Sequence, residues 1–399
     1  MAISPLILLS VVAFAAAEIP VASQSWEIPP IVNSWVPTDP GYYVTPVSKP
    51  FTLSGVTNWG RMNDSTQEYN VYRDGGGSCS LYNRTFWVYS DSSAYSKTTG
   101  LFLGAASNSM TIAMDFNQPN KLLDFTLLPW TGWEPAIPFT EEEAAVSGGG
   151  DTGCRYALWT NTNCAQLTET RAMHFFKVQK FNNPSNSTYY GNTMAIYTMD
   201  PVNNVITIER PRQYWYSNTT YGYGNFAALV FNGMAYLYGI DTTYSNNYDI
   251  HLAKVPVDHE TDMRYYRYYD SAAHSYSSTM PVPTERRQWA AVVSGTDTFS
   301  TGSVFWSEYH NAFLMVFYND LADSTFRVLS APSPVGPWNV SSAVLYDSVP
   351  GPRGYNYGGT ASPVYYQQPG QVAGKELLLQ YSYQDTKHTY PVALQATFV

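Results

Sequence analysis

Residues 73–91 read RDGGGSCSLYNRTFWVYSD, and this stretch decides which fold we expect. Its first half is extended in character and its second half is rich in β-branched and aromatic residues, which predicts two antiparallel strands joined by a turn at Asn83-Arg84. A hairpin brings its outer ends together. Asp74 and Asp91, which bracket the stretch, are therefore expected near one another at the open end.

The expected register places both aspartates on one face of the hairpin. With Tyr82 opposite Thr85, Asp91 lies opposite Gly76, two residues after Asp74. Side chains alternate along a strand, so the two carboxylates share a face unless the neighbouring glycines bend the chain. The segment therefore offers a candidate carboxylate pair, although aspartates that only cap loops are the simpler interpretation of such positions.

The same hairpin pattern recurs along the chain. Each copy has an aromatic strand, a turn, a second apolar strand and a closing aspartate; the copies end at Asp91, Asp241, Asp320 and Asp385. The first spacing is about twice the later ones, so the segment 155–178 is expected to hold one more copy. Repeated antiparallel sheets suit radial closure, and the chain therefore predicts an all-β, five-bladed β-propeller of four-stranded antiparallel blades, with a two-sheet sandwich as the alternative.

The composition restricts the class of partner. The chain has 399 residues and a formal net charge of −10, and 16% of its residues are aromatic. Only 13% are charged, against roughly 25% in an average soluble domain. Because no cluster of lysine or arginine supplies the positive surface that nucleic acids require, nucleic-acid binding is not expected. A monomer is expected.

The N-terminus predicts export. Residues 3–17 are apolar and end in small residues, so we assign 1–17 to a signal peptide cleaved between 17 and 24, 25–50 to an N-terminal extension and 51–399 to a single propeller domain. The segment is short for a membrane span. Five N-x-S/T sequons also favour a secreted glycoprotein: Asn63, Asn83, Asn186, Asn218 and Asn339.

Three cysteines fit an extracellular protein. Cys154 and Cys164 are close enough in sequence to close a small loop and are predicted to form a disulfide. Cys79 is then left as a buried thiol, with no histidine nearby in the sequence to activate it.

Several motifs resemble those of the secreted DUF4185-type family of five-bladed propellers, of which some bacterial members are endo-D-arabinanases. The DGG segment at Asp74 and the VYSD strand at Asp91 are similar to a glycine-rich Asp motif and an FGD motif of that family. Further matches are SVFWSEYHNAFLMVFYND (303–320), APSPVGPW (331–338) and YNYGGTASPVYY (355–366). The resemblance implies a glycoside hydrolase with Asp74 and Asp91 as its catalytic pair. This sequence has YSD at residues 89–91 where that family has FGD. The chain also resembles a fungal sequence.

Glycoside hydrolysis needs one protonated carboxyl and one carboxylate. We expect Asp91 to be the acid, because it ends an aromatic strand, and Asp74 to be the base, in an open glycine-rich loop. The two-residue offset between them favours a separation of about 6.5–9.5 Å and inversion of the anomeric centre.

Residues around the pair are candidates for binding the sugar. Arg73 could steer a hydroxyl or carboxylate, although a surface ion pair is its more common role. Aromatic platforms are expected among Trp59, Tyr72, Trp87, Trp289 and Tyr357, each of which could equally be core. Asn356 flanks Tyr357, and His174 could face the propeller axis or be a core histidine. The six histidines lack zinc-binding spacing, and no phosphate loop precedes a helix, so neither a metal nor a cofactor is expected.

Three functions fit these features. The first is a secreted hydrolase of a polysaccharide, possible substrates being an arabinofuranan or another cell-wall glycan. The second is a polysaccharide lyase, which needs a tyrosine or histidine base and a group that neutralises a uronate. The third is a carbohydrate-binding propeller without catalysis. Fold alone does not choose among them.

Overall fold

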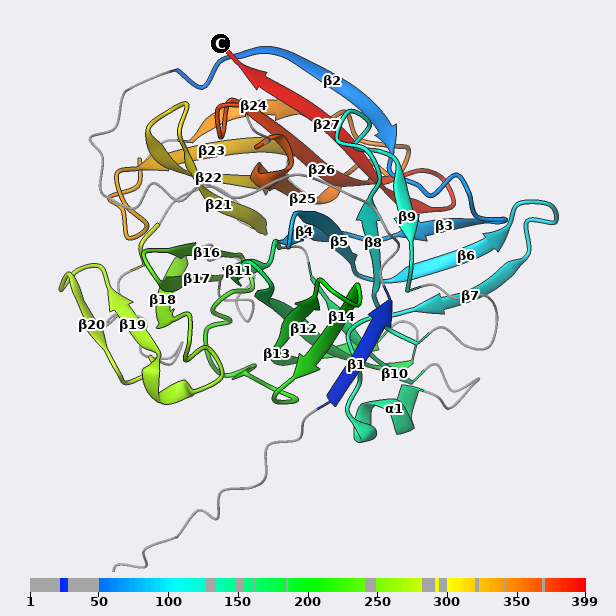
Figure 1. The fold of residues 1–399 in the computed structure, drawn as a ribbon, viewed down its shortest axis with the longest axis horizontal. Helices are drawn as coiled ribbons and strands as arrows, with labels where there is room; N and C mark the ends of the chain where they lie inside the picture. The colour runs from blue at the N-terminus through cyan, green and yellow to red at the C-terminus, as the bar shows by residue number, and fades with distance from the viewer. Residues whose placement is uncertain are drawn as a thin grey trace, which may run out of the picture.

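The chain folds almost entirely into antiparallel strands in the computed structural model (Figure 1). The structure describes residues 22–27, 50–126, 134–147, 154–160, 162–183, 186–240, 249–281, 291–293, 300–319, 323–339, 342–367 and 370–399. The all-β prediction is confirmed. In these ranges no helix has the length and apolar character needed to cross a membrane.

Residues 69–96 form one long hairpin. One arm consists of β3 (Tyr69–Arg73) and β4 (Gly76–Leu81), and the other of β5 (Arg84–Tyr89) and β6 (Ser92–Ser96). The predicted register is wrong by two residues, because the turn is Tyr82-Asn83 and Leu81 pairs with Arg84. Both turn residues have positive φ, 45° and 60°, as a two-residue type I′ hairpin requires.

The first sheet has the order β4-β5-β8-β9, with β8 at Ser109–Ala113 and β9 at Leu122–Asp124. The outer half of the hairpin pairs separately as β3-β6-β7, with β7 at Phe102–Ala106. Gly77 explains part of the glycine-rich stretch: a Cβ there would lie 1.7 Å from the carbonyl oxygen of Thr162. The glycine therefore permits close packing against the next sheet.

The second sheet is the largest. Its main path is β1-β14-β13-β12-β10, with β11 also paired to β12 and β15 to β13. Its strands are β10 (Arg155–Trp159), β11 (Ala165–Thr168), β12 (Arg171–Asn183), β13 (Asn186–Asp200), β14 (Val205–Arg210) and β15 (Tyr216–Ser217). The edge strand β1 (Ala22–Glu27) lies before the predicted domain start at residue 51, so part of the expected N-terminal extension joins this sheet.

Three further sheets complete the described fold. The third comprises β16 (Ala227–Phe231), β17 (Met234–Ile240), β18 (Ile250–Pro256), β19 (Arg267–Asp270) and β20 (Ser275–Ser277). The fourth comprises β21 (Thr301–Ser307), β22 (Ala312–Asn319), β23 (Thr325–Ala331) and β24 (Ala343–Asp347). The fifth joins β25 (Tyr357–Ser362), β26 (Glu376–Gln384) and β27 (Thr389–Phe398) to β2 (Leu53–Arg61), and Figure 1 shows β2 beside β27.

Five strands from five different sheets contact one another in sequence. The contacts run from β4 to β11, β11 to β16, β16 to β21, β21 to β25 and β25 back to β4. Asn163 fixes part of this arrangement, since its amide nitrogen donates to Ser303 Oγ at 3.0 Å and to the Ala361 carbonyl at 2.6 Å. Its amide oxygen accepts from the Ser78 backbone N–H at 2.8 Å. One side chain thereby connects three neighbouring sheets.

Short helices are few within the described ranges: α1 (Glu141–Ser147) and two 3₁₀ segments, η2 (Met263–Tyr265) and η4 (Pro363–Tyr366). Buried Glu143 anchors α1, because Arg210 of β14 donates to both of its carboxylate oxygens, at 2.5 and 3.1 Å. Thr140 and Glu143 also cap the helix reciprocally.

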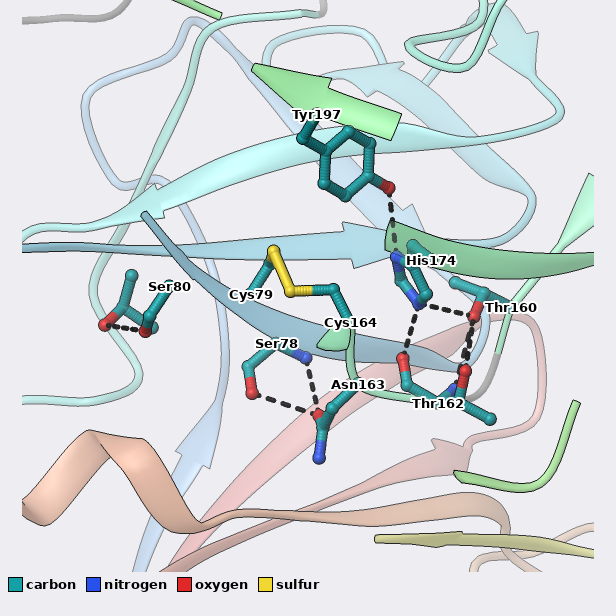
Figure 2. The surroundings of a disulfide bond; sticks show 10 residues. Ser78, Cys79, Ser80, Thr160, Thr162, Asn163, Cys164, His174 and Tyr197 are labelled. Atoms are coloured by element: carbon teal, nitrogen blue, oxygen red, sulfur yellow. Dashed lines mark hydrogen bonds between the residues drawn. A yellow bond between two sulfur atoms is a disulfide. The ribbon is translucent and has the colours of Figure 1, made fainter. Parts of the chain in front are cut away.

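The disulfide joins Cys79 to Cys164 and connects the first two sheets (Figure 2). The predicted Cys154–Cys164 pair is therefore wrong, as is the free thiol at Cys79. β10 and β11 pair with opposite ends of β12, which holds Cys154 and Cys164 apart. The Cys154 thiol instead donates to the Asn182 carbonyl at 3.1 Å.

Candidate active site

Asp74 and Asp91 line the same cavity, which has a volume of about 440 Å³. The Asp74 backbone N–H donates to the Asp91 carbonyl at 2.8 Å, so the two residues lie directly opposite each other across the hairpin. Directly opposed residues of antiparallel strands have Cβ atoms about 4.5–5.5 Å apart. The predicted two-residue offset is absent, and the backbones of the two residues lie opposite each other. We refer to this hollow as the aspartate cavity.

Asp91 is held by two side chains of β10. Arg155 donates from both terminal nitrogens, at 2.9 Å to Oδ1 and 2.6 Å to Oδ2, and the Trp159 indole N–H donates to Oδ1 at 2.9 Å. Arg155 and Trp159 are four residues apart on a strand and therefore share a face. The bidentate contact supplies two charge-assisted hydrogen bonds and fixes the orientation of the carboxylate.

Asp74 has a different environment. Burial raises its pKa to about 6, and the nearby charge of Asp91 adds to the rise, while a hydrogen bond with Tyr357 and the positive charges of Arg155 and Arg353 oppose it. The Tyr357 hydroxyl also hydrogen-bonds Thr389, and burial together with Asp74 raises the tyrosine pKa. Asp74 therefore keeps its proton up to about pH 6, well above the range of an ordinary aspartate.

The surroundings of the two aspartates differ from those expected from the sequence. Asp91 was expected to be desolvated by its aromatic strand, but its partners Arg155 and Trp159 satisfy its charge. Asp74 was expected in an open loop, but it is half-buried and lies beside a second carboxylate. The proton is therefore retained more strongly on Asp74 than the sequence suggested.

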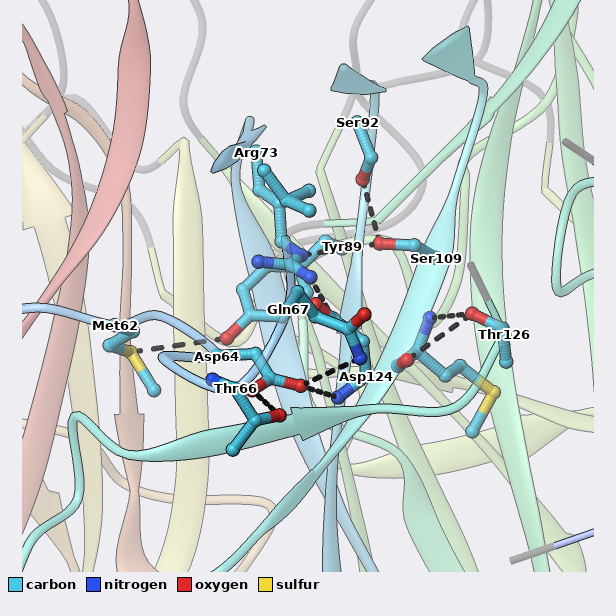
Figure 3. Close-up of polar contacts among 12 residues, drawn as sticks. Met62, Asp64, Thr66, Gln67, Arg73, Tyr89, Ser92, Ser109, Asp124 and Thr126 are labelled. Atoms are coloured by element: carbon cyan, nitrogen blue, oxygen red, sulfur yellow. Dashed lines mark hydrogen bonds and ion pairs between the residues drawn. The ribbon is translucent and has the colours of Figure 1, made fainter. Parts of the chain in front are cut away.

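Arg73 does not reach the aspartate cavity. It lies on the opposite face of its strand from Asp74 and is buried with its guanidinium paired to Asp124 (Figure 3). The same guanidinium lies 5.1 Å from the Tyr89 ring centroid. Burial raises the pKa of Asp124 to about 6, although Arg73 opposes the rise. The predicted substrate-binding role of Arg73 is wrong, and the pair belongs to the core.

Two further predicted binding residues are also structural. Asn356 is buried and donates from its amide to Ser348 Oγ at 3.0 Å and to the Val349 carbonyl at 3.2 Å. His174 is buried between the Thr162 carbonyl, at 2.7 Å from Nε2, and the Tyr197 hydroxyl, at 2.9 Å from Nδ1 (Figure 2). Burial lowers its pKa to about 4. It is a neutral core histidine, the alternative that the sequence left open.

The predicted aromatic platforms separate into distinct groups. Tyr72 lines the aspartate cavity, and Tyr357 contacts Asp74 at its edge. Trp87 is fully buried, and Trp59 donates to Gln395 at 3.3 Å on the fifth sheet. Trp289 lies outside the described residues, as do Asp241 and Asp320.

Sequence reasoning missed the residues that hold Asp91. Arg155 and Trp159 fall on one face of the strand RYALW, and the sequence shows this. Nothing in the sequence, however, relates this strand to a carboxylate 64 residues earlier. His388 was also missed, although it lines the aspartate cavity. In the part of the chain that the structure describes, no group of three or more His, Cys, Asp or Glu side chains is arranged to hold a metal ion.

The fold is similar to solved structures. A candidate hydrolase from Bacteroides ovatus superposes with a TM-score of 0.57 at 14% identity, over 84% of this chain and 93% of that one. The GH43_1 enzyme of Xanthomonas citri gives 0.45 at 10% identity over 84% and 91%, and a GH43 β-1,3-galactosidase, BT0265, gives 0.44 at 11% over 86% and 60%. No family model and no curated protein matches the sequence. At these identities the similarity concerns the fold, and it rests on the first structure.

Proposed function

We propose that the protein is a secreted glycoside hydrolase that cleaves a polysaccharide with Asp74 and Asp91. The supporting observation is the contrast between two facing carboxyls: Asp74 has its pKa raised to about 6, and Asp91 is ion-paired to Arg155. Paired carboxyls whose environments separate their proton affinities are the requirement of this reaction.

Asp74 is the proposed acid. Its proton passes to the glycosidic oxygen as the bond to the anomeric carbon breaks, and Tyr357 keeps the carboxyl oriented. Asp91 is the proposed base, which takes a proton from the attacking water. Three of its acceptor positions are occupied by Arg155 and Trp159, which leaves Oδ2 able to accept one more hydrogen bond.

The side chains favour inversion, although not through the offset inferred from sequence. Asp91 binds Arg155 and Trp159 of the second sheet, whereas Asp74 binds Tyr357 of the fifth. The carboxyls are drawn toward different sheets, which supports the separation of about 6.5–9.5 Å that admits a water molecule. A carboxylate held on both oxygens is also a weak nucleophile.

A five-bladed propeller is the proposed scaffold. The cyclic contacts among β4, β11, β16, β21 and β25 support it. So does the pairing of β2 with β27, which builds the last blade from both ends of the chain. Similarity to the Bacteroides ovatus structure supports the same type of fold. DUF4185 membership and an arabinofuranan substrate stay proposals from the motif resemblance.

Secretion also remains a proposal. Asn186, Asn218 and Asn339 are exposed, as glycosylation requires, while Asn63 and Asn83 are half-buried. Asn83 lies at the turn of the hairpin and lines a different cavity from the aspartates, so a glycan there would leave the aspartate cavity open. The protein is proposed to act as a monomer without a cofactor.

A lyase is less well supported. Its base would be Tyr357 or a histidine. The tyrosine pKa is raised and His174 is buried in the core, which leaves His388 of the aspartate cavity for that role. Arg155 is already neutralised by Asp91 and is not available to a uronate. Purified protein should therefore release reducing sugar from a neutral polysaccharide without an unsaturated product absorbing in the ultraviolet. Proton NMR of the first products should show the inverted anomer. Binding without cleavage across arabinans, xylans and galactans would instead favour the carbohydrate-binding propeller.

A further inference from the structure

A second hollow lies on the fifth sheet, with a volume of about 390 Å³. Its lining includes Arg61, Tyr381, Tyr383, Asp385 and Tyr390. Tyr383 and Tyr390 are directly opposite on β26 and β27, with ring centroids 5.4 Å apart and an angle of 38° between the ring planes. We refer to this hollow as the outer groove.

The outer groove and the aspartate cavity are lined by side chains that contact one another. Tyr72, which lines the aspartate cavity, stacks on His388 with a centroid distance of 3.8 Å. The Arg61 guanidinium, which lines the outer groove, lies 4.1 Å from the Tyr72 ring centroid and 5.2 Å from that of Tyr390. A ligand that fills the aspartate cavity and extends past Tyr72 therefore reaches the outer groove.

The side chains of the outer groove suit a sugar ring. The half-buried faces of Tyr383 and Tyr390 can pack against the C–H face of a sugar, because aromatic rings provide broad apolar contact with little conformational entropy to lose. Arg61 Nε is buried and makes no hydrogen bond with the residues that the structure describes. Asp385 contributes a carboxylate beside it. Hydroxyl groups would bind between these two charges.

We propose that the outer groove binds a further sugar unit of the glycan whose bond lies between Asp74 and Asp91. This inference rests on the proposed function and extends it to a substrate class: a neutral chain longer than a disaccharide. Neutrality follows from charge balance, since Arg61 lies with Asp385 in one hollow and Arg155 is paired to Asp91 in the other. A uronate would meet the Asp385 carboxylate in the outer groove and the Asp91 carboxylate beside Arg155 in the aspartate cavity.

The test measures how affinity depends on chain length. Calorimetric titrations use Asp74→Asn protein, which should bind without cleaving, and arabino-, xylo- and galacto-oligosaccharides of two to six units. With the ligand series that the native protein cleaves, affinity should rise by about tenfold once the chain extends past Tyr72. Adding Tyr383→Ala should abolish this rise and leave disaccharide affinity unchanged, whereas Tyr383→Phe should retain it. Tyr265→Ala, at an exposed tyrosine of the 3₁₀ segment η2, is the matched control.

Each outcome decides one claim. If the native protein cleaves the glycan and Tyr383→Ala keeps the same dependence of affinity on chain length, the outer groove does not bind a further sugar unit. The proposed hydrolase activity would not be affected by that result. Absence of cleavage in every series would overturn the hydrolase, and the outer groove with it. If circular dichroism shows that Tyr383→Ala does not fold, Tyr390→Ala replaces it. This variant should also lose the dependence of affinity on chain length, and an unchanged dependence would overturn the proposal.

Discussion

Asp74 and Asp91 face each other where both arms of the hairpin are interrupted, between β3 and β4 and between β5 and β6, yet their carboxyls bind partners on different sheets. The backbone contact is 2.8 Å from the Asp74 nitrogen to the Asp91 oxygen, whereas Asp91 binds Arg155 and Asp74 binds Tyr357. Identical side chains in facing positions thereby have different surroundings, and burial raises the pKa of Asp74 to about 6. This relationship yields several expected outcomes.

Replacing either carboxyl should remove turnover without unfolding the protein. Asp74→Asn and Asp91→Asn should each lower kcat by roughly 10²–10⁴-fold, the usual contribution of a positioned acid or base. Initial rates on the cleaved polysaccharide measure this, with circular dichroism as the check on folding. Asp200→Asn, at an aspartate outside the cavity, should keep native activity. Near-native rates in both cavity variants would show that the two aspartates only cap loops.

Activity should decline as the pH rises above about 6. Asp74 has its pKa raised to about 6 and must be protonated to act as the acid, so the fraction in the active form falls through that range. The profile of kcat/KM against pH measures the alkaline limb. A rate that stays constant from pH 5 to 8 would exclude Asp74 as the acid.

The same pKa affects stability. Between about pH 4 and pH 6 the folded state binds more protons at Asp74 than the unfolded state, so the free energy of unfolding falls as pH rises through this window. The loss is at most roughly 3 kcal/mol, and smaller because Asp74 is only half-buried. Asp74→Asn should melt higher than native protein at pH 8, with the difference shrinking at pH 4. A native melting temperature lower at pH 4.5 than at pH 8, with no such change in the variant, would contradict the sign.

Arg155 is expected to matter through Asp91. Arg155→Lys keeps a positive charge but loses the bidentate contact, so Asp91 should be less well oriented. We expect kcat to fall by about tenfold or more with little change in KM, since positioning acts on the chemical step. Arg267→Lys is the control, because the Arg267 guanidinium binds the backbone carbonyls of Arg264 and Tyr266, away from the aspartate cavity. Equal effects in the two variants would remove the positioning role.

Arg73 should contribute stability and not substrate affinity. Arg73→Leu leaves the Asp124 carboxyl unpaired in the core, and breaking a buried pair in this way costs about 3–5 kcal/mol. Urea denaturation measures the loss. Arg264→Leu, which breaks the exposed Arg264–Asp262 pair, should leave the denaturation midpoint unchanged. A raised KM in Arg73→Leu without loss of stability would restore the substrate-binding interpretation.

The sequence predicted the hairpins and their aspartates better than the contacts between sheets. Turn chemistry and aromatic alternation are local, so 73–91 and its copies were recognisable. The register was wrong because the choice between Tyr82-Asn83 and Asn83-Arg84 depends on which residues accept positive φ. The disulfide was wrong because proximity in sequence was taken for proximity in space. Arg155 could not be assigned to Asp91, since only packing of the second sheet against the first brings them together.

The pairing of β2 with β27 has a consequence for how the chain matures. β2 ends at Arg61 and its partner strand begins at Thr389, so more than three hundred residues must be synthesised between them. During translation the early strand has no neighbour on this edge, and its backbone groups stay hydrated. The fifth sheet is completed only after β27 has left the ribosome. A nascent chain arrested before β27 should therefore remain protease-sensitive at β2.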